Sequence, residues 1–142
     1  MTVEAQMPPT HVQHINPPGL HSNPAYTQVV TVDGPVRTVY VGGQNAVNAN
    51  GEIVGDDIAA QTRQVLHNIE LALAGAGARW EHVIKMNLLL AQGQPVQPGF
   101  EVWQQVWGSR PNPPLITAAI VAGLAHPQFL LEIDALAVVP QA

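Results

Sequence analysis

The most regular hydrophobic pattern in the chain lies near its middle, between a pair of aspartates and two glycines. Its apolar positions recur at helical spacing, at Ile58, Val65, Leu66, Ile69 and Leu73. Asp56 or Asp57 supplies the N-cap, and Gly75 and Gly77 end the pattern. The sequence therefore predicts an amphipathic helix with one covered face.

Six other segments have the β-branched content or the alternation that is typical of strands. They are residues 11–16, 27–32, 36–43, 83–91, 114–124 and 129–139. A turn signal at residues 33–35 separates the second and third segments and favours a hairpin between them. In the last segment Leu131 and Glu132 fall on opposite faces, because side chains alternate along a strand.

A second helix is predicted around residues 100–107, which gives the order β-β-β-α-β-α-β-β. Two helices separated by one strand imply a right-handed crossover and a sheet with both helices on one face. We expect one α+β domain over residues 11–142, preceded by a mobile tail over residues 1–10. The uncovered sheet face then requires a partner subunit.

Composition supports that requirement. Only 11% of the 142 residues are charged, whereas an ordinary domain carries about 25%. Part of the surface is therefore expected to be covered by oligomerisation. The net charge is -5 and the five basic side chains are scattered, so no patch is available for nucleic acid.

Several other classes of protein are disfavoured by what the sequence lacks. With no cysteine there is no disulfide, thiolate nucleophile or sulfur-ligated metal, and the histidines at 11, 14 and 21 match no zinc spacing. No apolar run approaches the ~20 residues that span a bilayer, and no export signal is found. We expect a soluble cytoplasmic protein that needs no cofactor or metal and does not bind a membrane.

A series of short motifs then gives the chain a likeness to a known family. They are Gly42-Gly43-Gln44, Gly51-Glu52, Gln61 with residues 64–69, Ala76-Gly77 and Glu132-Ile133-Asp134-Ala135. In order and spacing this series resembles the reactive intermediate deaminase (RidA/YjgF) family. The resemblance implies a chorismate-mutase-like fold, with a six-stranded mixed sheet and two helices, that forms a homotrimer with ligand clefts between subunits.

One departure from the family pattern bears directly on substrate. In members that hydrolyse enamines and imines, the strand after the second helix begins Pro-Ala-Arg-Ser, and its arginine holds the substrate carboxylate. Here Ile116 takes the position of that arginine. Isoleucine cannot offset the several kcal/mol that desolvation of a carboxylate costs. We therefore expect 2-imino acids to bind poorly, in a divergent branch of the family.

The resemblance also implies the site residues. Tyr26 resembles the family's pocket tyrosine, and Glu132 resembles the glutamate that orients the attacking water. Each has a simpler reading: Tyr26 plugs the core, or Glu132 is a solvent-facing acid. The expected ligand-binding positions are Gly42, Gln44, Phe100, Trp103, Ile116, Thr117 and Ala118.

Two of these positions make the pocket less polar than in the family, since Gly42 replaces a serine and Phe100 an asparagine. The stripe of Phe100, Trp103 and Trp107 is also compatible with a core or interface. Arg110 precedes the site strand and is a candidate replacement for the missing arginine. Two functions remain open: hydrolysis of a C=N bond in a small carbonyl or imine compound, and ligand binding or sensing without catalysis.

Overall fold

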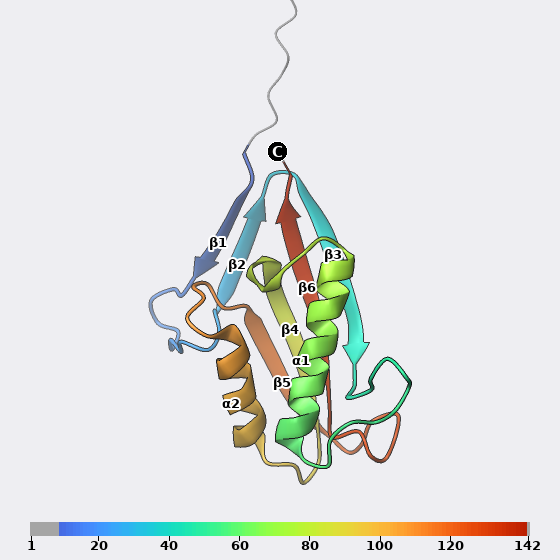
Figure 1. Cartoon of the computed structure of the whole chain (residues 1–142). Helices are drawn as coiled ribbons and strands as arrows, with labels where there is room; N and C mark the ends of the chain where they lie inside the picture. Colours follow the sequence, from blue (N-terminus) through green and yellow to red (C-terminus); the bar gives the residue numbers. More distant parts are fainter. Residues whose placement is uncertain (1–8, 142) are drawn as a thin grey trace, which may run out of the picture.

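The computed structural model describes residues 9–141 (Figure 1). Its elements are β1 His11–Ile15, β2 Val29–Asp33, β3 Val36–Gln44, α1 Ile58–Gly75, the 3-10 helix η1 Trp80–His82, β4 Val83–Ala91, α2 Val96–Trp107, β5 Leu115–Val121 and β6 Leu131–Pro140. The predicted order of strands and helices is confirmed. Of the tail expected over residues 1–10, residues 1–8 lie outside the described part.

The two helices have clear local causes. Asp57 caps α1, because its side chain accepts a hydrogen bond from the backbone N–H of Ala60 at 2.8 Å. Helix α2 begins at Val96, four residues earlier than predicted. Pro98 is tolerated there, because it occupies the first turn, where a backbone N–H has no partner within the helix.

Four of the strands form one mixed sheet in the order β3-β6-β4-β5. Strand β6 is antiparallel to both β3 and β4, whereas β4 and β5 are parallel and joined through α2. Both helices cover the same face of this sheet, as predicted (Figure 1). The fold is therefore α+β, with the core between the helices and one sheet face.

The predicted hairpin across residues 33–35 is wrong. Strand β2 pairs with β1, so the six strands form a two-stranded and a four-stranded sheet instead of one continuous sheet. The cause lies at the turn. A side-chain carbon at Gly34 would lie 2.8 Å from the carbonyl oxygen of Pro9, and the carbonyl of Pro35 accepts hydrogen bonds from Thr10 and Gln141. The turn is tied to residues 9, 10 and 141, at the two ends of the described part of the chain.

The face of the four-stranded sheet away from the helices is open. Tyr40 on β3 projects from it with 82% of its surface exposed. Asn87 on β4 donates to the carboxylate of Asp134 on β6 at 2.9 Å on the same face. Within residues 9–141, no helix combines the length and apolar character needed to cross a membrane.

Candidate functional site

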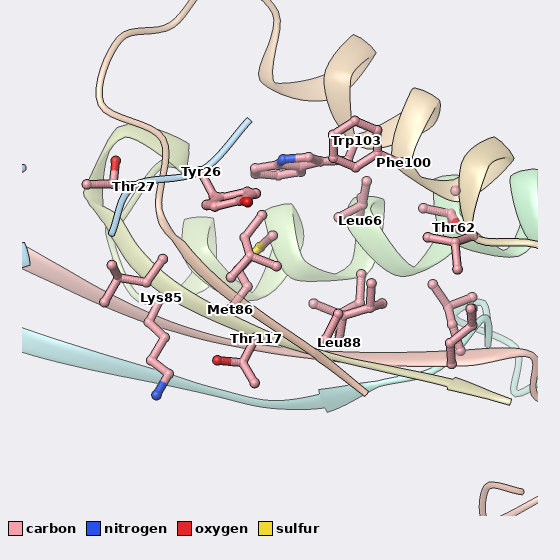
Figure 2. A pocket seen from close by; sticks show the side chains of 18 of the residues that line it. Tyr26, Thr27, Thr62, Leu66, Lys85, Met86, Leu88, Phe100, Trp103 and Thr117 are labelled. Carbon is pink, nitrogen blue, oxygen red and sulfur yellow. The ribbon is translucent and has the colours of Figure 1, made fainter. Parts of the chain in front are cut away.

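A cavity of about 560 Å³ lies between the two helices and the sheet. Sites for small ligands have volumes of roughly 300–1,000 Å³. Most of its wall is apolar and comes from Ile58, Leu66, Phe100 and Trp103 on the helices and Met86, Leu88, Leu90, Ile116, Leu131 and Ile133 on the strands. Figure 2 shows the rings of Tyr26, Phe100 and Trp103 on one side and Met86 and Leu88 on the sheet side. The cavity suits a small, largely apolar compound.

The wall provides little for a carboxylate. Ile116 lies in it, opposite Met86 in the β4–β5 ladder. Among the described residues, Lys85 is the one lysine or arginine that lines the cavity, and its ammonium group points away from the aromatic rings (Figure 2). A bound anion would therefore meet no lysine or arginine directed at it from the described part of this wall.

One corner of the cavity is polar. We define it as His21, Tyr26 and Gln28, which all line the cavity. The hydroxyl of Tyr26 lies 2.6 Å from Nε2 of His21, and the two rings meet edge to face. Nε2 of Gln28 donates to the backbone carbonyl of His21 at 3.0 Å. The three side chains therefore form one connected group.

The segment that carries this corner is tied to the rest of the domain. The side chain of Asn23 accepts a hydrogen bond from the backbone N–H of Ala25, which closes a turn just before Tyr26. Thr27 is bonded to the carbonyls of Pro113 and Pro114, which precede β5. Trp103 donates weakly to the carbonyl of Ala25 at 3.4 Å. These contacts fix Tyr26 between α2 and β5.

Glu132 lies on the other side of the sheet. Its neighbours Leu131 and Ile133 line the cavity, so Glu132 itself projects from the open face, opposite Leu89. It packs against Gly43, where a side-chain carbon would lie 2.8 Å from its Cδ and Oε2 atoms. The half-buried carboxylate of Glu132 therefore occupies the space that a side chain at residue 43 would need, and glycine leaves that space free.

The structure thus divides the sequence-predicted site residues into two groups. Tyr26, Phe100, Trp103, Ile116, Thr117 and Ala118 line the cavity. Gly42 and Gln44 on β3 and Glu132 on β6 do not line it, and the Gln44 side chain donates to the carbonyl of Gly42. Within one subunit, Tyr26 and Glu132 do not share a cavity.

Sequence reasoning missed His21 and Gln28 as site residues. In the sequence, His21 stands out only as one of three histidines whose spacing matches no zinc motif. Residues 9–141 contain no cluster of three or more His, Asp or Glu side chains that could hold a metal ion. The usable signal was its position five residues before Tyr26, across a turn built by Asn23 and Pro24.

Arg110 does not line the cavity. Its Nη1 donates to the carbonyls of Val106 and Trp107 at 2.7 and 3.0 Å, and its Nε contacts the carboxylate of Glu81 at 3.0 Å. A cation at the last carbonyls of a helix is stabilising. This side chain therefore caps α2 and does not replace the arginine that the family pattern would place at residue 116.

Comparisons with known proteins agree with this fold. Residues 19–139 match the family described as Endoribonuclease L-PSP. The chain is 32% identical over 114 residues to human 2-iminobutanoate/2-iminopropanoate deaminase, which covers 80% of this chain and 79% of the human protein. The Rid family protein YyfB of Yersinia pestis has a TM-score of 0.77 at 30% identity, over 90% of this chain and 98% of its own. E. coli TdcF, solved with bound serine, has a TM-score of 0.66 at 29% identity, over 72% and 80%.

Proposed function

Because this chain belongs to the Endoribonuclease L-PSP family, the RidA/YjgF family that its motifs resemble, we propose that it hydrolyses the C=N bond of a small uncharged imine. The observation that carries the proposal is Ile116 in the wall of an apolar cavity. A substrate that keeps the imine but lacks a carboxylate fits that wall.

The proposal departs from the names of the relatives. Iminobutanoate and iminopropanoate carry a carboxylate, as does the serine bound in E. coli TdcF. In this chain the described cavity wall offers such a group only Lys85, whose ammonium points away. An unpaired carboxylate in an apolar site costs several kcal/mol. We therefore carry over the C=N chemistry and not the acid substrate.

Nor is ribonuclease activity carried over from the family description. Five basic side chains spread over 142 residues, with a net charge of -5, provide no surface for a phosphate backbone.

The complete site is proposed to form between subunits of a cytoplasmic homotrimer. Tyr26 and Glu132 lie on opposite sides of the sheet, and β5, at the end of the sheet, lines the cavity. A second copy whose open face meets that edge would bring its own Glu132 to the cavity of the first. Glu132 would then orient the attacking water, and Tyr40 and its neighbours would be covered.

A coupled assay of ammonia release tests the substrate class. Imines without a carboxylate are generated in place by an amine oxidase, and 2-imino acids by an amino-acid oxidase. We expect the unmodified protein to accelerate hydrolysis of the first group and the Ile116→Arg variant to gain activity on the second. Preference of the unmodified protein for 2-imino acids would show that the arginine is dispensable and overturn the proposal.

A second candidate function is ligand binding without catalysis, and the apolar wall around Phe100 and Ile116 favours it. A binder would be stabilised by its ligand by RT ln(1 + [L]/Kd) without forming product. Thermal unfolding with uncharged imines and the corresponding ketones, run beside the ammonia assay, separates the two functions.

A further inference from the structure

The polar corner contains a hydrogen-bonded pair of titratable side chains, and the proposed function assigns a proton transfer to neither of them. Within the described residues, the titratable side chains on the cavity wall are His21, Tyr26 and Lys85. The ammonium of Lys85 points away from the rings, whereas His21 and Tyr26 are 2.6 Å apart. Among the described side chains of the wall, this pair is therefore placed to transfer a proton at the corner.

The surroundings determine which partner holds the proton. The amide nitrogen of Gln28 is identified by its donation to the carbonyl of His21 at 3.0 Å. The same nitrogen lies 3.4 Å from Nε2 of His21. Since an amide nitrogen donates and does not accept, Nε2 is favoured as the acceptor, with the ring proton on Nδ1. The hydroxyl of Tyr26 then donates to His21 and keeps its lone pairs free.

We propose that Tyr26 accepts the proton of the attacking water at this cavity while His21 Nε2 accepts the proton of Tyr26. The inference rests on the proposed function and adds a residue to it. Tyr26 would touch the reacting water, whereas His21 acts through Tyr26 as a positioning residue and proton acceptor.

The step balances for the imine after it has taken one proton from solvent, and the substrate carries no other charge. Water adds to the imine carbon, a C–O bond forms, and the π electron pair of the C=N bond moves to nitrogen. The proton lost by the water reaches the Tyr26 oxygen as the Tyr26 proton passes to His21, so the positive charge moves from the iminium to the imidazolium. The pair then returns a proton to nitrogen, the C–N bond breaks, and ammonia leaves. The carbinol hydroxyl releases its proton to solvent as the C=O bond forms.

The positions of the two residues suit this exchange. Tyr26 is partly buried and lies among the aromatic side chains of the cavity, whereas His21 is exposed. The imidazole is neutral again once its proton has been returned to nitrogen, so the pair is ready for the next turnover. Positioned acid–base groups of this kind accelerate reactions by roughly 10²–10⁴-fold.

The first test is the tautomer of His21, read from long-range ¹H–¹⁵N NMR spectra of the imidazole at neutral pH. We expect the Nδ1–H form in the unmodified protein and a shift toward Nε2–H in Tyr26→Phe, which removes the donor. An unmodified protein with the Nε2–H form would overturn the inference, whether or not the protein is active.

The second test is the kinetics of ammonia release from the best uncharged imine. We expect His21→Gln to lower kcat by roughly 10²-fold with KM changed less than about twofold, since a structural role would instead weaken binding. His67→Gln, an exposed histidine of α1 outside the cavity, is the control and should be unchanged. An active protein whose kcat does not respond to His21→Gln overturns this inference alone, whereas an unmodified protein without turnover on any imine overturns the proposed function and the relay with it.

Discussion

The face of the sheet that the helices cover and the face that they leave open are built from alternate residues of the same strands, yet they differ in chemistry. The covered face presents Leu131 and Ile133 to an apolar cavity, whereas the open face presents Glu132 to Gly43 and pairs Asn87 with Asp134. The period of two along a strand allows both. It also places the candidate catalytic residues of one subunit on different sides of the sheet, with Tyr26 at the cavity and Glu132 on the open face.

The covered face should account for most of the stability of the subunit. Leu73 is fully buried in α1, whereas Leu71, two residues earlier, is 58% exposed. We expect Leu73→Ala to lower the free energy of unfolding by roughly 2–5 kcal/mol, because a cavity remains in the core. Leu71→Ala is the matched control, at roughly 0.5 kcal/mol or less. Denaturant unfolding at one protein concentration measures both, and equal losses would contradict this assignment of the core.

A complementation experiment tests whether the two faces form one site between subunits. We expect Tyr26→Phe and Glu132→Gln each to lower turnover by roughly 10²-fold. When the two variants are unfolded together and refolded, about a quarter of the shared sites should receive both intact residues.

Recovery of activity in that mixture, and not on mixing the folded proteins briefly, is the expected result. If the mixture is no more active than its components, Tyr26 and Glu132 do not act at a site shared between subunits.

The contact between Gly43 and Glu132 allows a smaller and more local perturbation of the open face. A methyl group at residue 43 must displace the Glu132 carboxylate, because it would lie 2.8 Å from its atoms. We expect Gly43→Ala to lower kcat by about tenfold, with a small effect on stability because the end of a side chain can move. Gly123→Ala is the control, since a side-chain carbon there meets nothing within 4 Å. Equal kcat values for the two variants would exclude a positioning role for Gly43.

The features that could be predicted from the sequence are those that depend on local residue patterns. Asp57 and the apolar spacing after it predict α1, and the alternation around Leu131 and Glu132 predicts their separation to opposite faces. The hairpin prediction failed because the path of the chain at Gly34 depends on contacts with Pro9 and Gln141, which lie far from this turn in the sequence.

The polar corner was missed for a similar reason. The hydrogen bond of Thr27 to Pro113 spans 86 residues, and it is this contact that holds the Tyr26 segment between α2 and β5. Arg110 shows the converse. Its position shortly before β5 in the sequence suggested that its side chain reaches the cavity. In the structure the guanidinium instead binds the carbonyls at the end of α2 and the carboxylate of Glu81.

The smallest effect we predict is a loss of stability in mild acid. It comes from two histidines that lie outside the four-stranded sheet. Burial lowers the pKa of His14 on β1 below its ordinary value of 6.5, and its Nε2 has no hydrogen-bond partner in the described structure. Burial, followed by the charge of Arg79, likewise lowers the pKa of His82.

Below pH 6.5 the unfolded chain therefore binds protons that the folded chain does not, so the free energy of unfolding should be retained above that pH and fall as the pH decreases below it. Replacing His14 by Gln removes one of the two groups and should make this fall shallower. Urea unfolding of the two proteins between about pH 7 and pH 5 measures the slope. Identical slopes would show that His14 is solvated in the folded state, and the β1–β2 pair would then be more open than its buried imidazole nitrogen indicates.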